Sequence, residues 1–246
     1  DVTLCVDVMK VNRIPMLITL SRNIRFGTIE AIPNQLSKTL IKGIQDVASV
    51  YRRGGFWITL ALMDGEFEAL HGDLADEGIA LNITASDEHV GDIERYIRTV
   101  KERMRAIYNT LPFQHIPGRL VIEMAKHCVF WLNAFPQVNG ISGTISPRTI
   151  VTGQKVDFHR HCKHEFGEYV QTHEKHDNSM VPRTVGALAL RPTGNAQGSH
   201  YYFSLSSCCV INRGYATPLP MPAEVIDQVH RIARRQKADP GLLFTK

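Results

Sequence analysis

The order of strand-like and helix-like segments in the first half of the chain constrains its fold more than any other feature. Residues 4–9, 15–21 and 26–32 are short, rich in β-branched side chains and separated by few residues, which predicts an antiparallel meander. A helical period follows at 37–51, where apolar side chains recur on one face. The continuous apolar run 56–63 has the length of a strand buried on both faces. This order predicts an α/β domain with a mixed sheet.

The alternation continues and then gives way to a different kind of sequence. A strand is predicted at 79–85, and two long helices at 90–109 and 117–134. In the last third of the chain, short strand-like segments spaced by turn residues predict a small all-β, barrel-like module with a C-terminal helix at 222–235. We therefore expect three parts, which are a helix-flanked domain at 1–140, a linker at 141–165 and the β module at 166–246.

Composition limits the class of protein. The chain has 246 residues, of which 43% are hydrophobic, so it can bury a core. Its longest uncharged apolar stretch, 55–63, has nine residues, whereas a spanning helix needs about 20, which excludes a membrane span. Five cysteines without a framework spacing favour a reducing compartment. The chain opens at Asp1 directly before a predicted strand, so we expect a piece of a longer polypeptide.

Three carboxylates lie at positions in the predicted elements that are candidates for a functional role. Asp7 lies in the middle of the first predicted strand, where an unpaired buried charge costs several kcal/mol. Asp64 ends the apolar run 56–63 at a turn, and sites form at the carboxyl ends of strands in α/β sheets. Glu94 lies near the start of the helix 90–109. Singly, each also has an ordinary interpretation as an edge residue, a turn-initiating Asp or a helix-surface charge.

The helix 90–109 carries a basic face. Counted from Glu94, the positions i+4, i+7 and i+11 are Arg98, Lys101 and Arg105. A solvated face with Glu–Arg pairing explains this pattern for a helix alone. The same cations also suit contacts with a phosphate backbone, and the net charge of +4 permits a nucleic-acid partner. The basic residues at 231–246 are consistent with contact to nucleic acid or with a solvated terminus, and we expect the solvated terminus.

Together the three carboxylates suit a site for two metal ions. They come from two strands and the following helix, with spacings of 57 and 30 residues. Phosphoryl transfer by a pair of Mg²⁺ or Mn²⁺ ions needs carboxylate oxygens from separate elements around an open face. The sequence therefore predicts Asp7, Asp64 and Glu94 as catalytic metal ligands. The predicted nucleic-acid-binding residues are Arg98, Lys101 and Arg105.

In these residues and their order, the chain resembles the integrase core of copia-type LTR retrotransposons. That core is a DDE enzyme with the ribonuclease H-like fold. The two Asp residues of that family match Asp7 and Asp64, and its Glu matches Glu94. Its DNA-contacting basic residues match Arg98 and Lys101. The resemblance extends to the helix and β-barrel module that follow the core in such polyproteins, through the segments 130–136, 183–191 and 219–222.

The resemblance implies both a fold and an activity. The fold would be a ribonuclease H-like mixed sheet flanked by helices over 1–140, followed by the small β-barrel module. The activity would be that of a Mg²⁺-dependent polynucleotidyl transferase, which processes DNA 3′ ends and joins them to target DNA. The partners would be DNA and further copies of the chain, with no membrane and no small-molecule substrate. The location would be the nucleus, after assembly in cytoplasmic virus-like particles.

The chain departs from the family pattern at two places. Asp64 is followed directly by Gly65 instead of Asn-Gly, and the segment 85–89 lacks the usual Pro and Gln residues. Other acidic side chains lie close to the matched ones in sequence. These acidic alternatives are Glu66, Glu88 and Asp92.

Two other functions stay open at this level. The first is a decayed or repurposed integrase that acts as a DNA-binding or assembly module and keeps the basic face. The second is a nuclease of the same fold that acts on RNA–DNA hybrids, because both reactions use the same metal chemistry. Carboxylates that converge on one pocket would favour an enzyme, and carboxylates too far apart to share ions would favour the binding module.

Overall fold

Two compact units make up the part of the chain that the structure describes. The computed structural model describes residues 1–83, 91–174, 178, 180 and 182–245. Within these, unit 1 takes residues from 1–104, 128–155 and 243–246, and unit 2 from 105–127 and 156–242. Each unit therefore combines segments that are distant in sequence. The domain boundaries 1–140, 141–165 and 166–246 stay a prediction.

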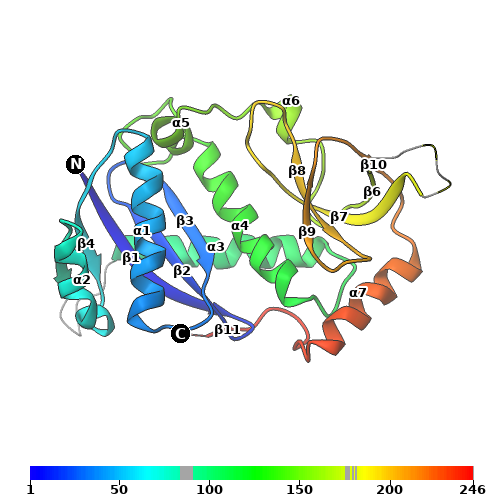
Figure 1. Ribbon diagram of the computed structural model, residues 1–246, viewed down its shortest axis with the longest axis horizontal. Coiled ribbons are helices and arrows are strands. Elements are labelled where there is room, and N and C mark those ends of the chain that lie inside the picture. The colour runs from blue at the N-terminus through cyan, green and yellow to red at the C-terminus, as the bar shows by residue number, and fades with distance from the viewer. Residues whose placement is uncertain (84–90, 175–177, 179, 181, 246) are drawn as a thin grey trace. The chain divides into compact units, whose positions relative to one another are not determined.

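Unit 1 is built on a mixed sheet with the strand order β3-β2-β1-β4-β5 (Figure 1). The first three strands form an antiparallel meander, whereas β4 and β5 run parallel to β1. This order confirms the predicted α/β class with a mixed sheet, and it places β1 between β2 and β4. The strands are β1 (Val2–Val11), β2 (Ile14–Ser21), β3 (Gly27–Ala31), β4 (Ile58–Met63) and β5 (Ala80–Ile83).

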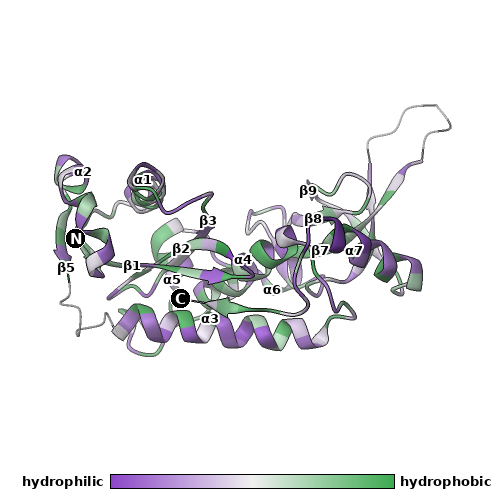
Figure 2. Ribbon diagram, turned by 90° about the horizontal axis from the view of Figure 1, so that it is seen from below, coloured by the Kyte–Doolittle hydropathy of each residue, from purple (hydrophilic) through white to green (hydrophobic). Residues whose placement is uncertain are grey.

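Helices cover both faces of this sheet (Figure 2). Helices α1 (Ser37–Arg53) and α2 (His71–Asp76) lie on one side, and α3 (Gly91–Thr110) lies on the other. The 3-10 helix η1 (Gly65–Leu70) connects β4 to α2. The predicted starting residue of the long helix, Val90, and the last two residues of the predicted strand 79–85 lie outside the described residues. Among the described residues, no helix is long and apolar enough to cross a membrane.

The two faces of β1 differ in chemistry. Val6 and Val8 belong to the buried core that also contains Leu40 of α1. Burial of one such side chain contributes about 1.5–3 kcal/mol. Because side chains alternate along a strand, Cys5 and Asp7 face the opposite side of the sheet, which α3 covers. Asp7 is therefore on the face of the sheet that α3 covers.

The buried side-chain amide of Asn133 connects β3 to the end of α4 (Gly118–Ala134). Both ends of this connection belong to unit 1. The Gly27 N–H donates to Asn133 Oδ1 at 2.8 Å, and Asn133 Nδ2 donates to the Gly27 carbonyl at 2.7 Å. Asn133 is 5% exposed. Gly27 has no room for a larger residue, because a Cβ there would overlap the hydroxyl of Tyr96. The side chain of one asparagine thus satisfies both backbone groups where β3 begins.

The C-terminal residues join the same sheet. Strand β11 (Phe244–Thr245) pairs antiparallel with the end of β1, with Lys10 opposite Thr245 and Val11 opposite Phe244. The Asn12 N–H also donates to the Leu243 carbonyl at 2.8 Å. The backbone of this segment is thus paired, whereas the expectation for the basic residues at 231–246 stays a prediction.

Unit 2 contains a second, antiparallel sheet with the order β10-β6-β7-β8-β9. It lies in the region predicted to be all-β, although closure into a barrel stays a prediction. The predicted linker contains two short helices, α5 (Pro147–Thr152) in unit 1 and α6 (Phe158–His161) in unit 2. The other elements of unit 2 are β6 (Tyr169–His173), β7 (Thr184–Pro192), β8 (His200–Ser204), β9 (Val210–Arg213), β10 (Ala216–Pro218) and α7 (Ala223–Arg235).

Within unit 2, the buried carboxylate of Glu123 links α4 to β7 through ion pairs. Glu123 is 1% exposed and pairs with Arg119 at 3.4 Å and with Arg191 at 3.5 Å. The Arg191 guanidinium also lies over the ring of Tyr201, 4.3 Å from its centroid. A charge at this depth needs such partners, because removing one of them would leave an uncompensated ion in the interior.

Replacement of Asn133 tests the connection between β3 and α4. Asn133→Ala leaves the Gly27 N–H and carbonyl buried without partners, so we expect the free energy of unfolding to fall by about 2–4 kcal/mol. The exposed Asn82→Ala on β5 serves as the control and should change it by less than about 0.5 kcal/mol. Urea denaturation of both variants measures the difference. Equal stability of the two variants would contradict this role of Asn133.

Candidate active site

Asp7 is a partly buried carboxylate in the middle of β1. Its Oδ1 accepts a hydrogen bond from the Val8 N–H at 2.6 Å. Burial raises the pKa of Asp7 and this hydrogen bond lowers it, while the charges of Asp64, Glu66 and Glu94 also raise it. Together they bring the pKa of Asp7 to about 6. Four carboxylates from three segments of the chain therefore share one region of negative potential.

The register of the sheet explains why Asp64 comes close to Asp7. β1 and β4 are parallel neighbours in which Cys5 aligns with Leu62. Asp7 and Asp64 each follow this aligned pair by two residues, so the two chains bring them to the same level of the sheet. Asp64 precedes η1 and its carbonyl accepts the Phe67 N–H at 3.0 Å, which turns the chain sharply at this point.

Glu94 reaches the same region from α3. It is exposed in the first turns of the helix, and its charge is one of those that raise the pKa of Asp7. The three predicted residues thus come from two adjacent strands and one helix, as expected. Among the residues that the structure describes, however, no group of three His, Cys, Asp or Glu side chains is arranged to hold a metal ion. The carboxylates are electrostatic neighbours without forming a ready-made cage, and their assignment as ligands stays a prediction.

The predicted basic face lies on the solvent side of α3. Arg98 and Arg105 are exposed, and Lys101 is partly buried. The Lys101 ammonium lies 5.8 Å from the centroid of the Phe244 ring, so the C-terminal strand β11 contacts this face. Arg105 belongs to unit 2, whereas the other two cations belong to unit 1. The role of these residues in nucleic-acid binding stays a prediction.

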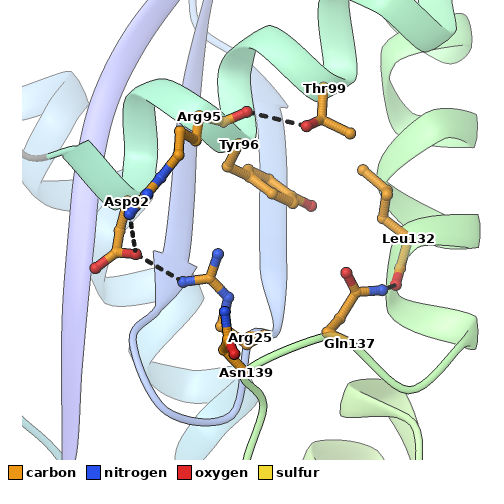
Figure 3. Close-up of a pocket in the computed structure, with 8 residues that line it drawn as sticks. All are labelled: Arg25, Asp92, Arg95, Tyr96, Thr99, Leu132, Gln137 and Asn139. Atoms are coloured by element: carbon orange, nitrogen blue, oxygen red, sulfur yellow. Dashed lines mark hydrogen bonds and ion pairs between the residues drawn. The ribbon is translucent and has the colours of Figure 1, made fainter.

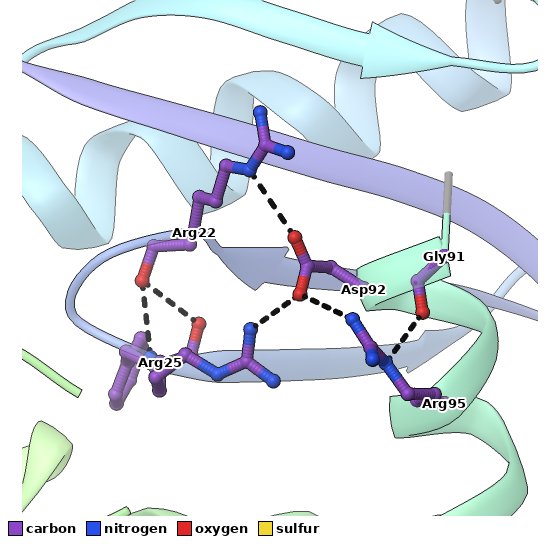
Figure 4. A network of polar contacts seen from close by, with 7 residues as sticks. Arg22, Arg25, Gly91, Asp92 and Arg95 are labelled. Atoms are coloured by element: carbon purple, nitrogen blue, oxygen red, sulfur yellow. Dashed lines mark hydrogen bonds and ion pairs between the residues drawn. The ribbon is translucent and has the colours of Figure 1, made fainter. Parts of the chain in front are cut away.

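Sequence reasoning missed a cluster of arginines around Asp92 (Figure 4). Asp92 pairs with Arg25 at 3.0 Å, with Arg22 at 3.2 Å and with Arg95 at 3.4 Å. Burial acts to raise the pKa of Asp92, but the hydrogen bond and charge of Arg25, followed by those of Arg22, hold it below its usual range. Asp92, noted above as an acidic alternative to Glu94, is therefore engaged in ion pairs. Its position in the first turn of a predicted helix was a visible signal, whereas the two arginines 67 and 70 residues away were not.

Comparison with known proteins gives likenesses to solved structures alone. No family profile matches the chain, and no curated protein matches it either. Among solved structures, the catalytic core domain of BIV integrase is similar, with a TM-score of 0.43 and 16% sequence identity. The matched region covers 61% of this chain and 93% of that one.

Removal of the Asp7 charge should stabilise the protein at neutral pH. The folded state holds the Asp7 proton more tightly than the unfolded chain, since the pKa rises from 3.8 to about 6. Stability is therefore lost as the pH rises from about 4 to about 6, by up to about 3 kcal/mol. We expect Asp7→Asn to raise the free energy of unfolding by that amount at pH 7.5 and by less than about 1 kcal/mol at pH 4.

The matched control is Asp46→Asn, on the exposed side of α1. Denaturant titrations at the two pH values should show a pH-dependent gain for Asp7→Asn and less than about 0.5 kcal/mol for the control. A gain for Asp7→Asn that is equal at pH 4 and pH 7.5 would show that Asp7 does not titrate in this range.

Proposed function

We propose that the chain is a metal-dependent DNA integrase of a copia-type retrotransposon, a polynucleotidyl transferase acting on DNA 3′ ends. The observation that carries this proposal is the electrostatic coupling of Asp7 with Asp64 and Glu94. Neighbouring negative charges raise the free-energy cost of ionising the partly buried Asp7, and divalent cations relieve that cost. The sequence resemblance described above supports the same assignment.

The donor chemistry fits Mg²⁺ or Mn²⁺. Carboxylate oxygens are the ligands that these hard cations prefer, and an open side leaves room for water and phosphate oxygens. Asp64 is partly buried and Glu94 is exposed, so this group of carboxylates is accessible to solvent on the Glu94 side. Asp7 and Asp64 would hold the first ion, and Glu94 would complete the site for the second.

Each group of residues has a distinct task in this proposal. Bound metal ions would supply activation of the attacking oxygen and stabilisation of the leaving oxygen in an in-line displacement. Asp7 positions the site from the rigid centre of the sheet, while Asp64 and Glu94 close it from the neighbouring strand and helix. Arg98, Lys101 and Arg105 would bind the phosphate backbone without reading sequence.

The remaining parts of the proposal follow from the resemblance. The partners would be the DNA ends of the element, target DNA and further copies of the chain. No membrane and no small-molecule substrate enters the reaction. The site of action would be the nucleus, after assembly in cytoplasmic virus-like particles.

A non-catalytic DNA-binding or assembly module is the second candidate. One observation favours it. The described residues contain no preformed group of three metal-binding side chains. Such a module would bind DNA in a salt-dependent manner without turnover.

Substitution of Glu94 separates the two candidates. In the enzyme, Mg²⁺ or Mn²⁺ raises the melting temperature of the unaltered chain, and Glu94→Gln reduces this shift because the second site loses an anionic ligand. We expect Glu94→Gln to lower metal-dependent DNA strand transfer by at least about 100-fold, while DNA affinity changes by less than about twofold.

The control is Glu102→Gln, an exposed residue on the same helix, which should leave both properties unchanged. Strand transfer by Glu94→Gln at the rate of the unaltered chain would overturn the proposed role of Glu94. Salt-dependent DNA binding with neither a metal-induced shift nor turnover in the unaltered chain would establish the binding module.

A further inference from the structure

A pocket of about 260 Å³ lies within unit 1, beside the Asp92 cluster (Figure 3). Its walls come from the first turns of α3, the turn between β2 and β3, and the segment that follows α4. Three separate parts of the chain therefore surround one concave site. The side chains that matter for its chemistry are those of Arg25, Arg95, Tyr96, Thr99, Gln137 and Asn139.

The pocket has an excess of positive charge. Arg25 and Arg95 line the pocket together with the single carboxylate of Asp92, so the lining has one positive charge in excess. Arg22 pairs with the same carboxylate from outside the lining. Arg25 uses Nη1 for Asp92, and a guanidinium has five N–H donors, so further donors remain for a ligand. Figure 3 shows the guanidinium of Arg25 directed into the space between the lining side chains.

The backbone holds Arg25 in an unusual conformation. Its φ is +62°, in the left-handed region that costs a non-glycine residue about 1 kcal/mol. The Arg25 N–H donates to the Ser21 carbonyl at 2.9 Å, which closes the tight turn between β2 and β3. The fold therefore fixes the direction of this side chain at an energetic cost.

An unsatisfied hydroxyl lies at the same pocket. Tyr96 is 8% exposed, and its hydroxyl is buried without a hydrogen-bond partner. A buried hydroxyl without a hydrogen-bond partner lowers the stability of the folded state by about 1–3 kcal/mol. Burial raises the pKa of Tyr96, so the phenol stays neutral and keeps its proton to donate. Figure 3 shows the ring extending from α3 toward the space between Arg25 and Leu132.

The pocket borders the predicted carboxylate site. Asp92, Arg22 and Arg25 all act electrostatically on Cys5. Cys5 is on the same face of β1 as Asp7, two residues away. The arginine cluster is therefore a positive region next to the negative region around Asp7, along one face of the sheet.

We propose that this pocket binds a phosphate group of a nucleic-acid backbone, next to the carboxylate site. Guanidinium groups match the oxygens of a phosphate with paired N–H donors, and the neutral hydroxyl of Tyr96 and the amide of Asn139 add uncharged donors, whereas the Gln137 amide already donates to the Leu132 and Phe135 carbonyls. This inference rests on the proposed function for the source of the phosphate, since free inorganic phosphate has the same chemistry. The pocket is a binding subsite and takes no part in the chemical step.

The test measures two ligands in metal-free buffer containing EDTA. Anisotropy of a labelled DNA oligonucleotide gives its affinity across a range of salt, and the melting temperature in inorganic phosphate gives the affinity for the free anion. The variants are Arg25→Gln, which removes the central donor, and Thr99→Asp, which places a negative charge at the pocket rim. The control is Arg53→Gln, an exposed arginine at the end of α1 on the opposite face of the sheet.

We expect both pocket variants to weaken DNA binding by at least about tenfold and to lower the slope of log affinity against log salt by about one. The control should change affinity by less than about twofold. Thr99→Asp keeps the inference testable if Arg25→Gln does not fold, because Thr99 lies on the partly exposed side of α3. DNA affinity unchanged in Thr99→Asp would overturn the inference, as would variant effects confined to inorganic phosphate.

Tyr96→Phe distinguishes a ligand-binding role from a structural one. Loss of an unpartnered hydroxyl should leave the melting temperature in phosphate-free buffer unchanged or higher. We expect DNA affinity nevertheless to fall by about two- to tenfold, the range for one neutral hydrogen bond. Unchanged affinity would remove Tyr96 from the subsite.

Failure of this inference is distinguishable from failure of the proposed function. Pocket variants that bind DNA normally, in a protein with metal-dependent strand transfer, would reject the pocket and leave the enzyme intact. A chain without a metal response whose pocket variants lose DNA affinity would reject the enzyme and retain the pocket.

Discussion

The burial of β1 is the constraint on which the rest of the structure depends. Strands flank it on both sides and helical layers cover both faces, so each of its side chains must suit a packed environment. Val6 and Val8 meet this demand by joining the core beneath α1. Asp7 accepts a hydrogen bond from the Val8 N–H and is on the face of the sheet that α3 covers. A carboxylate held there is costly unless something binds it, which makes β1 the natural origin of a cation site.

Much of the architecture could be predicted because its signals are local. Alternation and the helical period located the elements of the mixed sheet, and the parallel pairing of β1 with β4 follows from the connection through α1. The coupling of Asp7 with Asp64 and Glu94 was expected from their positions in those elements. The ion pairs of Asp92 were not, because Arg22 and Arg25 lie about 70 residues away and only tertiary packing reveals such partners. Strand β11 was missed for the same reason, since a two-residue strand has no period.

One face of the sheet carries two opposite potentials side by side. The carboxylates around Asp7 repel one another, while the arginines around Asp92 are in excess over their single partner. An anionic ligand alone would favour the second region, and a cation alone would favour the first. A metal ion together with a phosphate would satisfy both at once. The two proposals therefore describe adjoining halves of one charge arrangement, although each can fail separately.

The pairing of β11 with β1 also bears on how the chain folds. Lys10 and Thr245 are partners in the sheet although almost the entire chain separates them. Closing so long a loop is entropically expensive, and contacts between distant residues slow the search for the native state. During synthesis, the strand that holds Asp7 can pair with β2 early, yet its last backbone partners emerge only after both units have been made. The meander of β1, β2 and β3 can thus form well before the sheet is complete, and β11 joins the sheet last.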